Sequence, residues 1–208
     1  KFINLIVKEV ILFDIDYTLL DTVVSKRYYR EKISKLADVS IDDFILVENE
    51  YKKKDSGFTD FHPEDYIKHI CNFYSLNENS VRELFFSNDN FKDALYDDVV
   101  PTLETLSDKF NLGIFSEGFE DFQLTKLSKS GIMHFFEKDL TFIFRRKLEE
   151  DSLALLPDNC FVVDDNPSVV EALAKTDKFK TFWLNRKSDE KNSVCATIHG
   201  LSSLNSLV

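Results

Sequence analysis

Short apolar runs alternate with amphipathic stretches along most of the chain, and this pattern predicts a parallel sheet flanked by helices. Five runs have the length and composition of buried strands, and they span residues 10–13, 111–115, 140–144, 160–163 and 180–184. Apolar residues at three- and four-residue spacing predict helices over 100–110, 120–130 and 167–174. We therefore expect a doubly wound, Rossmann-like α/β fold.

The segment 22–97 breaks this alternation. It has no convincing strand run, and its pattern is typical of amphipathic helices rich in Tyr, Phe and Lys. We expect an inserted helical cap domain at residues 22–97, and an α/β core domain assembled from residues 1–21 and 98–208.

Polar residues follow several predicted strands, at the end of the sheet where α/β proteins bind ligands. Asp14 and Asp16 follow the first strand, and in strand geometry side chains two residues apart face the same side. Two converging carboxylates are costly unless a cation or a proton compensates them, and Mg²⁺ prefers such oxygen ligands. Asp164 and Asp165, after a later strand, could complete its ligand shell. Either acidic pair alone is equally typical of a solvated turn or a helix cap.

Taken in chain order, four polar clusters resemble the motifs of the haloacid dehalogenase (HAD) superfamily. The matching residues are Asp14, Asp16, Thr18 and Asp21, then Ser116 and Gly118, then Lys147, and finally Asp164, Asp165 and Pro167. The resemblance covers about residues 8–185, and the helical insertion lies where that family's first class of cap is inserted. It implies a hydrolase, namely a Mg²⁺-dependent phosphatase with a class 1 cap.

The resemblance also implies a role for each matching residue. Asp14 would attack phosphorus to form an aspartyl-phosphate, and Asp16 would protonate the leaving alcohol and then activate water. Lys147 would neutralise charge on the nucleophile and the phosphoryl group. The implied phosphate-binding residues are Thr18, Ser116, Glu117 and Gly118, and the implied Mg²⁺ ligands are Asp14, Asp16 (through its backbone carbonyl), Asp164 and Asp165.

Asp16 favours a phosphatase over a dehalogenase, because the dehalogenases of this family lack the second aspartate. A phosphomutase of the same family and a non-catalytic binding or scaffold member remain alternatives. A response-regulator receiver combines similar residues, but its acidic pair precedes the phosphoacceptor, whereas here the pair follows. Tyr17 stands where many family members have glycine, and the basic residue of the third motif could be Arg145, Arg146 or Lys147, of which the family type favours Lys147.

The net charge of −11 argues against a nucleic-acid partner but does not exclude a phosphorylated substrate. The resemblance implies that the substrate is a small phosphorylated metabolite. Sugar phosphates, nucleoside monophosphates and phosphoglycolate-type compounds are all compatible with the motifs. In the cap, Phe58 and His62 are candidate substrate contacts. The sequence carries no signal for the oligomeric state.

The cysteines and the apolar segments indicate a cytoplasmic protein without a membrane partner. Cys71, Cys160 and Cys195 show neither metal-ligand spacing nor a disulfide framework. The apolar stretches of residues 1–14 are interrupted by polar residues, and no cleavage site of the secretory type follows them. No run approaches the roughly 20 apolar residues of a spanning helix.

Overall fold

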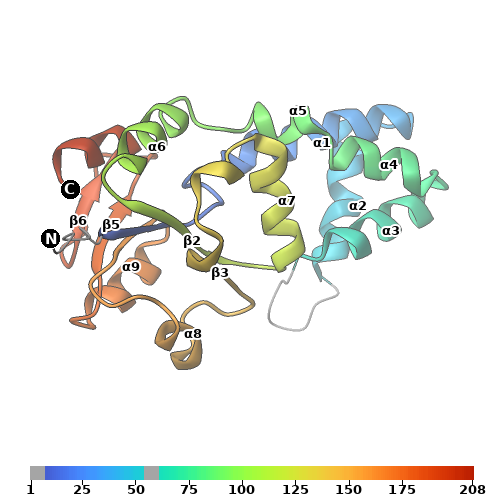
Figure 1. Ribbon diagram of the computed structural model, residues 1–208. Helices are drawn as coiled ribbons and strands as arrows, with labels where there is room; N and C mark the ends of the chain where they lie inside the picture. Colours follow the sequence, from blue (N-terminus) through green and yellow to red (C-terminus); the bar gives the residue numbers. More distant parts are fainter. Residues whose placement is uncertain (1–7, 54–60) are drawn as a thin grey trace, which may run out of the picture. The chain divides into compact units, whose positions relative to one another are not determined.

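The structure, a computed structural model, describes residues 8–53 and 61–208, which form two compact units (Figure 1). The α/β unit combines residues 8–20, 96–117 and 132–208. The helical unit combines the described residues of 21–95 with residues 118–131. Residues 1–7 and 54–60 lie outside the described residues.

The described part of the α/β unit contains a six-stranded parallel sheet of order β3-β2-β1-β4-β5-β6. Its strands are β1 (Val10–Phe13), β2 (Asn111–Glu117), β3 (Thr141–Phe144), β4 (Phe161–Asp164), β5 (Lys180–Leu184) and β6 (Ala196–Ile198). The predicted Rossmann-like α/β fold is therefore confirmed, and all five predicted strands are present. The edge strand β6 is an addition that the pattern of apolar residues did not predict.

Helices cover the sheet of the α/β unit (Figure 1). They are α6 (Val99–Ser107), α8 (Glu150–Ala154) and α9 (Pro167–Ala174), with 3₁₀ turns η1 (Met133–Phe135), η2 (Lys138–Leu140) and η3 (Leu201–Ser206). The start of α9 is encoded locally, because the Asn166 side chain accepts a hydrogen bond from the Ser168 N–H and Pro167 occupies the first turn. Its apolar face, with Val169 and Leu173, joins the core beneath β1 and β4.

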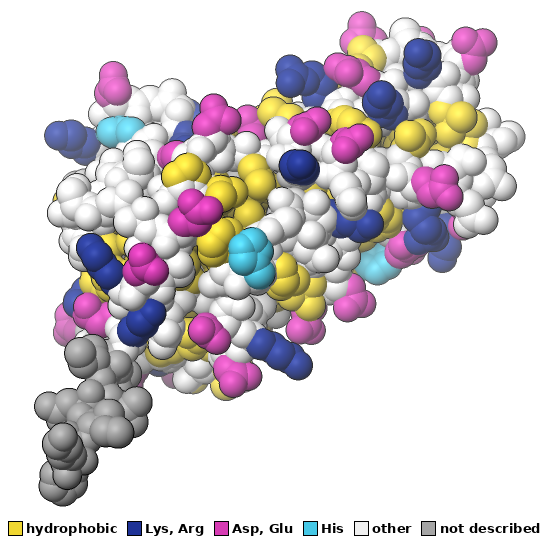
Figure 2. Space-filling view, turned by 45° about the horizontal axis from the view of Figure 1, so that its top comes forward, with side chains coloured by type: hydrophobic (Ala, Val, Ile, Leu, Met, Phe, Trp, Pro, Cys, Tyr) yellow, Lys and Arg dark blue, Asp and Glu magenta, His cyan; other side chains and the backbone are white. Residues whose placement is uncertain are grey.

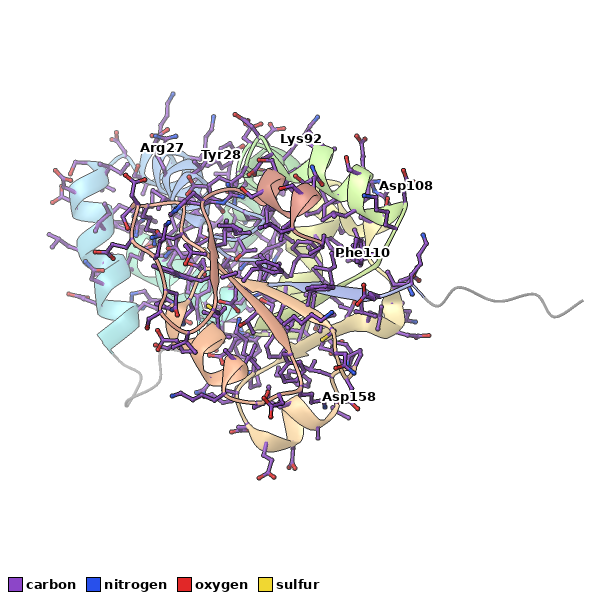
Figure 3. All side chains as sticks on the ribbon, turned by 90° about the vertical axis from the view of Figure 1, so that its left-hand side faces the viewer. Arg27, Tyr28, Lys92, Asp108, Phe110 and Asp158 are labelled. Atoms are coloured by element: carbon purple, nitrogen blue, oxygen red, sulfur yellow. The ribbon has the colours of Figure 1, made fainter. Side chains whose placement is uncertain are left out.

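Between α6 and β2, the side chain of Phe110 is buried, whereas those of Asp108 and Lys109 are exposed. Phe110 packs edge-to-face on Phe161 of β4, with ring centroids 6.0 Å apart (Figure 3). Asp108, two residues earlier, is exposed. Such aromatic pairs stabilise a core beyond the burial of their area, so this contact helps hold the residue before β2 against β4.

The helical unit packs around a cluster of aromatic side chains. Its helices are α1 (Thr22–Leu36), α2 (Ile41–Lys53), α3 (Pro63–Tyr74), α4 (Glu78–Phe85), α5 (Asn88–Lys92) and α7 (Glu120–Ser130). At its centre the fully buried Glu48 carboxylate accepts hydrogen bonds from Tyr29 (3.0 Å) and Tyr66 (3.3 Å) and forms an ion pair with Arg30. A buried carboxylate needs such complete pairing, so this network ties α1, α2 and α3 together.

The position of α7 differs from the domain boundaries expected from the sequence. Residues 118–131 belong to the helical unit, whereas the pattern of alternation assigns them to the α/β core. The physical reason is visible at Phe122, whose ring lies 5.9 Å from the rings of Phe61 and Phe85. The apolar face of α7 thus completes the aromatic core of the helical unit.

None of the helices in the described ranges is both long and apolar enough to cross a lipid bilayer. On the face drawn in Figure 2, Lys and Arg side chains are interspersed with Asp and Glu. This mixed surface differs from the continuous basic stripe that tracks a nucleic-acid backbone.

Candidate active site

The candidate site lies at the carboxyl edge of the sheet, where the central strand β1 ends. β1 pairs with β2 on one side and with β4 on the other, with Phe13 opposite Ile114 and Val163. The backbone N–H of Asp14 donates to the Val163 carbonyl (3.0 Å). Asp14 therefore leaves the sheet between two neighbouring strand ends, the position at which parallel α/β sheets bind ligands.

Three side chains from other strand ends surround the Asp14 carboxylate. Lys147 Nζ lies 2.8 Å from Asp14 Oδ1 and 2.5 Å from Asp164 Oδ2, and the Ser116 hydroxyl donates to Asp14 Oδ1 (3.1 Å). The side chains of Lys147, Asp14 and Asp164 are only 7%, 8% and 1% exposed. Burial disfavours the charged Lys147 ammonium, but the two carboxylates outweigh burial and raise the pKa of Lys147. The ammonium is therefore permanently charged and bridges two buried carboxylates.

The geometry separates Lys147 from the two arginines before it. The Arg146 side chain donates to the Arg145 carbonyl (2.5 Å), whereas the Lys147 ammonium donates to the Asp14 carboxylate. The Lys147 backbone N–H donates to Glu117 Oε2 (3.0 Å). Glu117, which the resemblance places among the phosphate-binding residues, is exposed and holds the loop that carries Lys147.

The chain turns sharply after Asp14. β1 ends at Phe13, and the Ile15 carbonyl accepts the N–H of Leu20 (3.0 Å), which closes a compact loop. Tyr17 adopts a left-handed backbone with φ of 61°. Glycine adopts this region without the steric cost that a side chain imposes, which explains why glycine suits this position in the family that the motif resembles.

Thr18 lies in the same loop, and its side-chain hydroxyl is buried without a hydrogen-bond partner in the described part of the chain. A buried hydroxyl without a partner costs about 1–3 kcal/mol, so such a group in a native protein calls for a partner such as a ligand, an ion or an ordered water. This observation fits the predicted phosphate contact of Thr18.

An acidic cluster adjoins the Lys147 bridge. Within the described residues, one carboxylate oxygen each from Asp14, Asp164 and Asp165 lies within 4.8 Å of the others. Burial, followed by the charge of Asp14, raises the pKa of Asp164 and raises the pKa of Asp165 to about 6. Three crowded oxygen ligands whose charges repel one another are the donor set that Mg²⁺ prefers, so these residues fit the ion.

The Asp16 carboxylate is not part of that acidic cluster among the described residues. The expectation that Asp14 and Asp16 face the same side assumed a continuing strand, whereas Asp16 lies beyond the end of β1 and forms a bridge with Leu20. The Asp16 carboxylate lies outside the three-oxygen cluster but near enough for its charge to act on Asp165, and the ligand role of its backbone carbonyl stays a prediction.

The other predicted residues lie in the helical unit or outside the described ranges. Gly118 has φ of 148°, and a Cβ there would come 2.9 Å from the Gln123 side chain, so glycine is required locally. His62 precedes α3, where Nδ1 accepts the Asp65 N–H (3.3 Å) and the ring packs edge-on against Phe119. Phe58 lies in the segment that the structure leaves undescribed. The proposed ligand contacts of these residues stay predictions.

Three contacts of the site were not foreseen from the sequence. The Asn166 N–H donates to Asp164 Oδ1 (2.9 Å), the Trp183 indole N–H donates to the Asp165 carbonyl (2.8 Å), and Arg186 donates to the Thr18 carbonyl (3.2 Å). The Asn-Pro that begins α9 is a sequence signal for the first contact. The other two depend on long-range packing, for which the sequence offers no local signal.

Trp183 provides a test of metal binding, because it is the single tryptophan of the chain and contacts the backbone of Asp165. We expect Mg²⁺ to change its fluorescence at neutral pH. Because the pKa of metal-free Asp165 is raised to about 6, protons compete with the ion below that pH, and the apparent affinity should fall up to about tenfold per pH unit. Titrations at about pH 7.5 and about pH 5 measure this dependence. Equal dissociation constants at the two pH values, or an unchanged response in Asp165→Asn, would contradict the assignment.

The fold and the site geometry can be compared with known proteins. No protein-family model matches the sequence, and no curated protein matches it. Solved structures do match along nearly the whole chain. YfnB from Bacillus subtilis, described as a HAD-hydrolase and bound to magnesium, has a TM-score of 0.66 at 13% identity, with 97% of this chain and 98% of that chain covered.

Two further structures give similar values. A haloacid dehalogenase-like protein from Burkholderia xenovorans LB400 has a TM-score of 0.72 at 15% identity, covering 97% of this chain and 96% of its own. A HAD phosphatase from Thermococcus onnurineus has a TM-score of 0.61 at 22% identity, covering 96% and 97%. L-2-haloacid dehalogenases also match. These similarities confirm the fold that the motif resemblance predicted.

Proposed function

We propose that this chain, which has the fold of the haloacid dehalogenase-like hydrolases, is a Mg²⁺-dependent phosphatase that hydrolyses a small phosphomonoester through an aspartyl-phosphate. The observation that carries this proposal is the buried Asp14 carboxylate, which contacts Lys147 and Ser116 and lies beside Asp164 and Asp165. A carboxylate nucleophile, a fixed cation, a hydroxyl donor and an acidic cluster are together the groups that phosphoryl transfer requires.

Each residue has a separate task in this mechanism. Asp14 attacks phosphorus, and its carboxylate displaces the alcohol. Lys147 offsets the negative charge that the nucleophile and the phosphoryl group bring together, and it is already charged and in place, so no reorganisation is needed. Ser116 and the unpartnered Thr18 hydroxyl donate to phosphoryl oxygens.

Asp14, Asp164 and Asp165 would hold Mg²⁺ through their carboxylates, with the Asp16 carbonyl as a further ligand. When bound, the ion supplies positive charge for the phosphoryl oxygens and offsets the mutual repulsion of the three carboxylates. Lys147 cannot replace it, because a single ammonium beside this many carboxylates leaves the cluster net negative.

The choice between phosphatase and dehalogenase depends on Asp16, since matching structures include both classes. A departing alkoxide needs a proton, whereas a departing halide does not. Asp16 follows the nucleophile by two residues in a fixed turn and is the candidate general acid. A phosphomutase would use the same groups, and a non-catalytic member would not need them, so phosphate release is the measurement that decides.

The proposal is tested by a phosphatase screen of the purified protein with Mg²⁺. The panel contains p-nitrophenyl phosphate, sugar phosphates, nucleoside monophosphates and phosphoglycolate, with 2-chloropropionate as a dehalogenase substrate. We expect phosphate release that EDTA abolishes, and no chloride release. Chloride release from the haloacid, or no turnover of any phosphate ester, would refute the assignment.

Asp16→Asn gives a second, sharper result. We expect kcat/KM to fall about 10²–10⁴-fold on alkyl phosphates, the range of general acid–base catalysis, because kcat/KM reports the steps up to departure of the leaving group and not the later attack of water. The loss should be much smaller on p-nitrophenyl phosphate, because p-nitrophenolate departs without a proton. Steady-state kinetics on both substrates measure this difference. Equal losses on the two substrates would show that Asp16 does not protonate the leaving group.

A further inference from the structure

Arg186, just after β5, contacts two segments of the α/β unit, the residues before α6 and the loop after β1. Its Nη1 and Nη2 donate to Asp98 Oδ2 (3.1 Å) and Oδ1 (2.8 Å), and Nη2 also donates to the backbone carbonyl of Thr18 (3.2 Å). The guanidinium carbon lies 3.9 Å from the centre of the Tyr96 ring. The planar group is thus held on its edge by a carboxylate and on its face by an aromatic ring.

Asp98 is itself fixed in place. It occupies the N-cap position of α6 but makes no side-chain capping bond there. Its carboxylate instead pairs with Arg186 and accepts the Leu201 N–H at Oδ2 (2.7 Å). An aspartate at this position ordinarily stabilises the helix start by accepting a backbone hydrogen bond. Here the Asp98 carboxylate binds the Arg186 guanidinium instead. The two side chains are only 15% and 22% exposed, which limits screening by water.

The Thr18 carbonyl belongs to the loop that connects Asp14 to Leu20. Within the loop, the Tyr17 N–H donates to the Leu20 carbonyl (2.7 Å), and Tyr17 holds a left-handed backbone that disfavours side chains. A loop that contains such a residue needs contacts from outside to keep one conformation. Arg186 supplies such a contact, a charge-assisted hydrogen bond to the carbonyl of Thr18, whose side-chain hydroxyl has no partner among the described residues.

We infer that Arg186 is a positioning residue, which holds the loop 14–20 so that Asp16 and Thr18 present their side chains to the phosphoryl group. Within the described part of the chain, the arginine contacts Asp98, the Tyr96 ring and the Thr18 carbonyl, and it acts on the site through that carbonyl. The kinetic part of this inference rests on the proposed phosphatase function. The structural part, the loop conformation, does not.

Hydrogen exchange tests the structural part without any substrate or metal. In Arg186→Met, which keeps the length but removes the donors, we expect the amides of residues 15–20 to exchange about tenfold faster or more. The amides of β4 should keep their protection. The control is Lys180→Met on the same unit, because Lys180 makes an exposed ion pair with Glu9 (3.2 Å) and lies over the Phe161 ring (4.5 Å), and neither partner belongs to the loop 14–20. Unchanged loop exchange, or equal acceleration of the loop and β4, would overturn the inference.

Kinetics of Arg186→Met and Arg186→Lys test the second part. A displaced loop should lower kcat about tenfold or more with little change in KM, since Asp16 and Thr18 act in the transition state. Arg186→Lys should be intermediate in both measurements, because an ammonium can pair with Asp98 but cannot span the carboxylate and the carbonyl together. Faster loop exchange with unchanged kcat would refute the catalytic consequence. If the unchanged protein hydrolyses no phosphate ester, the proposed function fails, while the exchange result still decides whether Arg186 holds the loop.

Discussion

Lys147→Met is expected to destabilise the α/β unit by about 3–5 kcal/mol at neutral pH, the cost of removing one partner from a buried ion pair. In the protein, the Lys147 ammonium lies between the carboxylates of Asp14 and Asp164, and all three side chains are less than a tenth exposed. Methionine fills the same volume without the charge. Two buried carboxylates would then face each other without a cation, and urea-induced unfolding at about pH 7.5 measures the resulting loss of stability.

The pH dependence identifies the cause of this loss. With the ammonium gone, the buried Asp164 should take up a proton in the folded state at a higher pH than in the unfolded chain, because burial and the charge of Asp14 already raise its pKa. The folded state then binds more protons than the unfolded state, so the variant gains stability as the pH falls, and its deficit shrinks between about pH 7.5 and pH 5. The unsubstituted protein keeps the Lys147 contribution over this whole range, because the folded-state pKa of Lys147 is raised.

Lys180→Met is the matched control for Lys147→Met. Lys180 pairs with Glu9 at 3.2 Å, but both side chains are more than half exposed. A surface pair of this kind contributes at most about 1 kcal/mol. Equal losses in the two variants, or a Lys147→Met deficit that does not change with pH, would show that the buried bridge is not the source of the stability.

The strands of the sheet could be predicted because buried parallel strands are continuous apolar runs. Val10–Phe13 and Lys180–Leu184 have the bounds that the sequence predicts. Ala196–Ile198 was missed because three residues at a sheet edge, beside polar neighbours, carry no such signal. The helix 120–130 was predicted with its correct bounds but in the other unit, because periodicity shows that a helix has an apolar face and not which core that face joins.

The site shows the same division between local and long-range information. That Asp14 and Asp164 lie together follows from strand order at one edge of a parallel sheet. The choice of Lys147 over Arg145 and Arg146 depends on how the loop after β3 folds back, and the sequence cannot supply that geometry. The backbone hydrogen bonds between Ile15 and Leu20 likewise turn the chain at Asp16. Asp16 therefore does not continue the strand geometry that the two-residue spacing suggested.

Asp14→Asn is expected to abolish turnover, with kcat lowered by at least about 10⁴-fold, because a neutral amide oxygen is a far poorer nucleophile than a carboxylate. The fold should survive, since asparagine has the same shape and Lys147 keeps its pairing with Asp164 (2.5 Å). Removing one charge from the acidic cluster also lowers the repulsion between its remaining members. Loss of activity without loss of structure is therefore the expected combination, measured by phosphate release and by urea unfolding.

A direct probe of the nucleophile completes the Asp14→Asn experiment. Beryllium fluoride mimics a phosphoryl group on a carboxylate, so an adduct with the unsubstituted protein should be visible by fluorine NMR and absent from Asp14→Asn. The Trp183 fluorescence response shows separately whether the variant still binds Mg²⁺ through the remaining ligands, Asp164 and Asp165. If Asp14→Asn turns over as fast as the unsubstituted protein, or forms the same adduct, Asp14 is not the nucleophile. An adduct retained in Asp14→Asn would point to a second carboxylate, and among the described residues Asp164 and Asp165 lie beside Asp14.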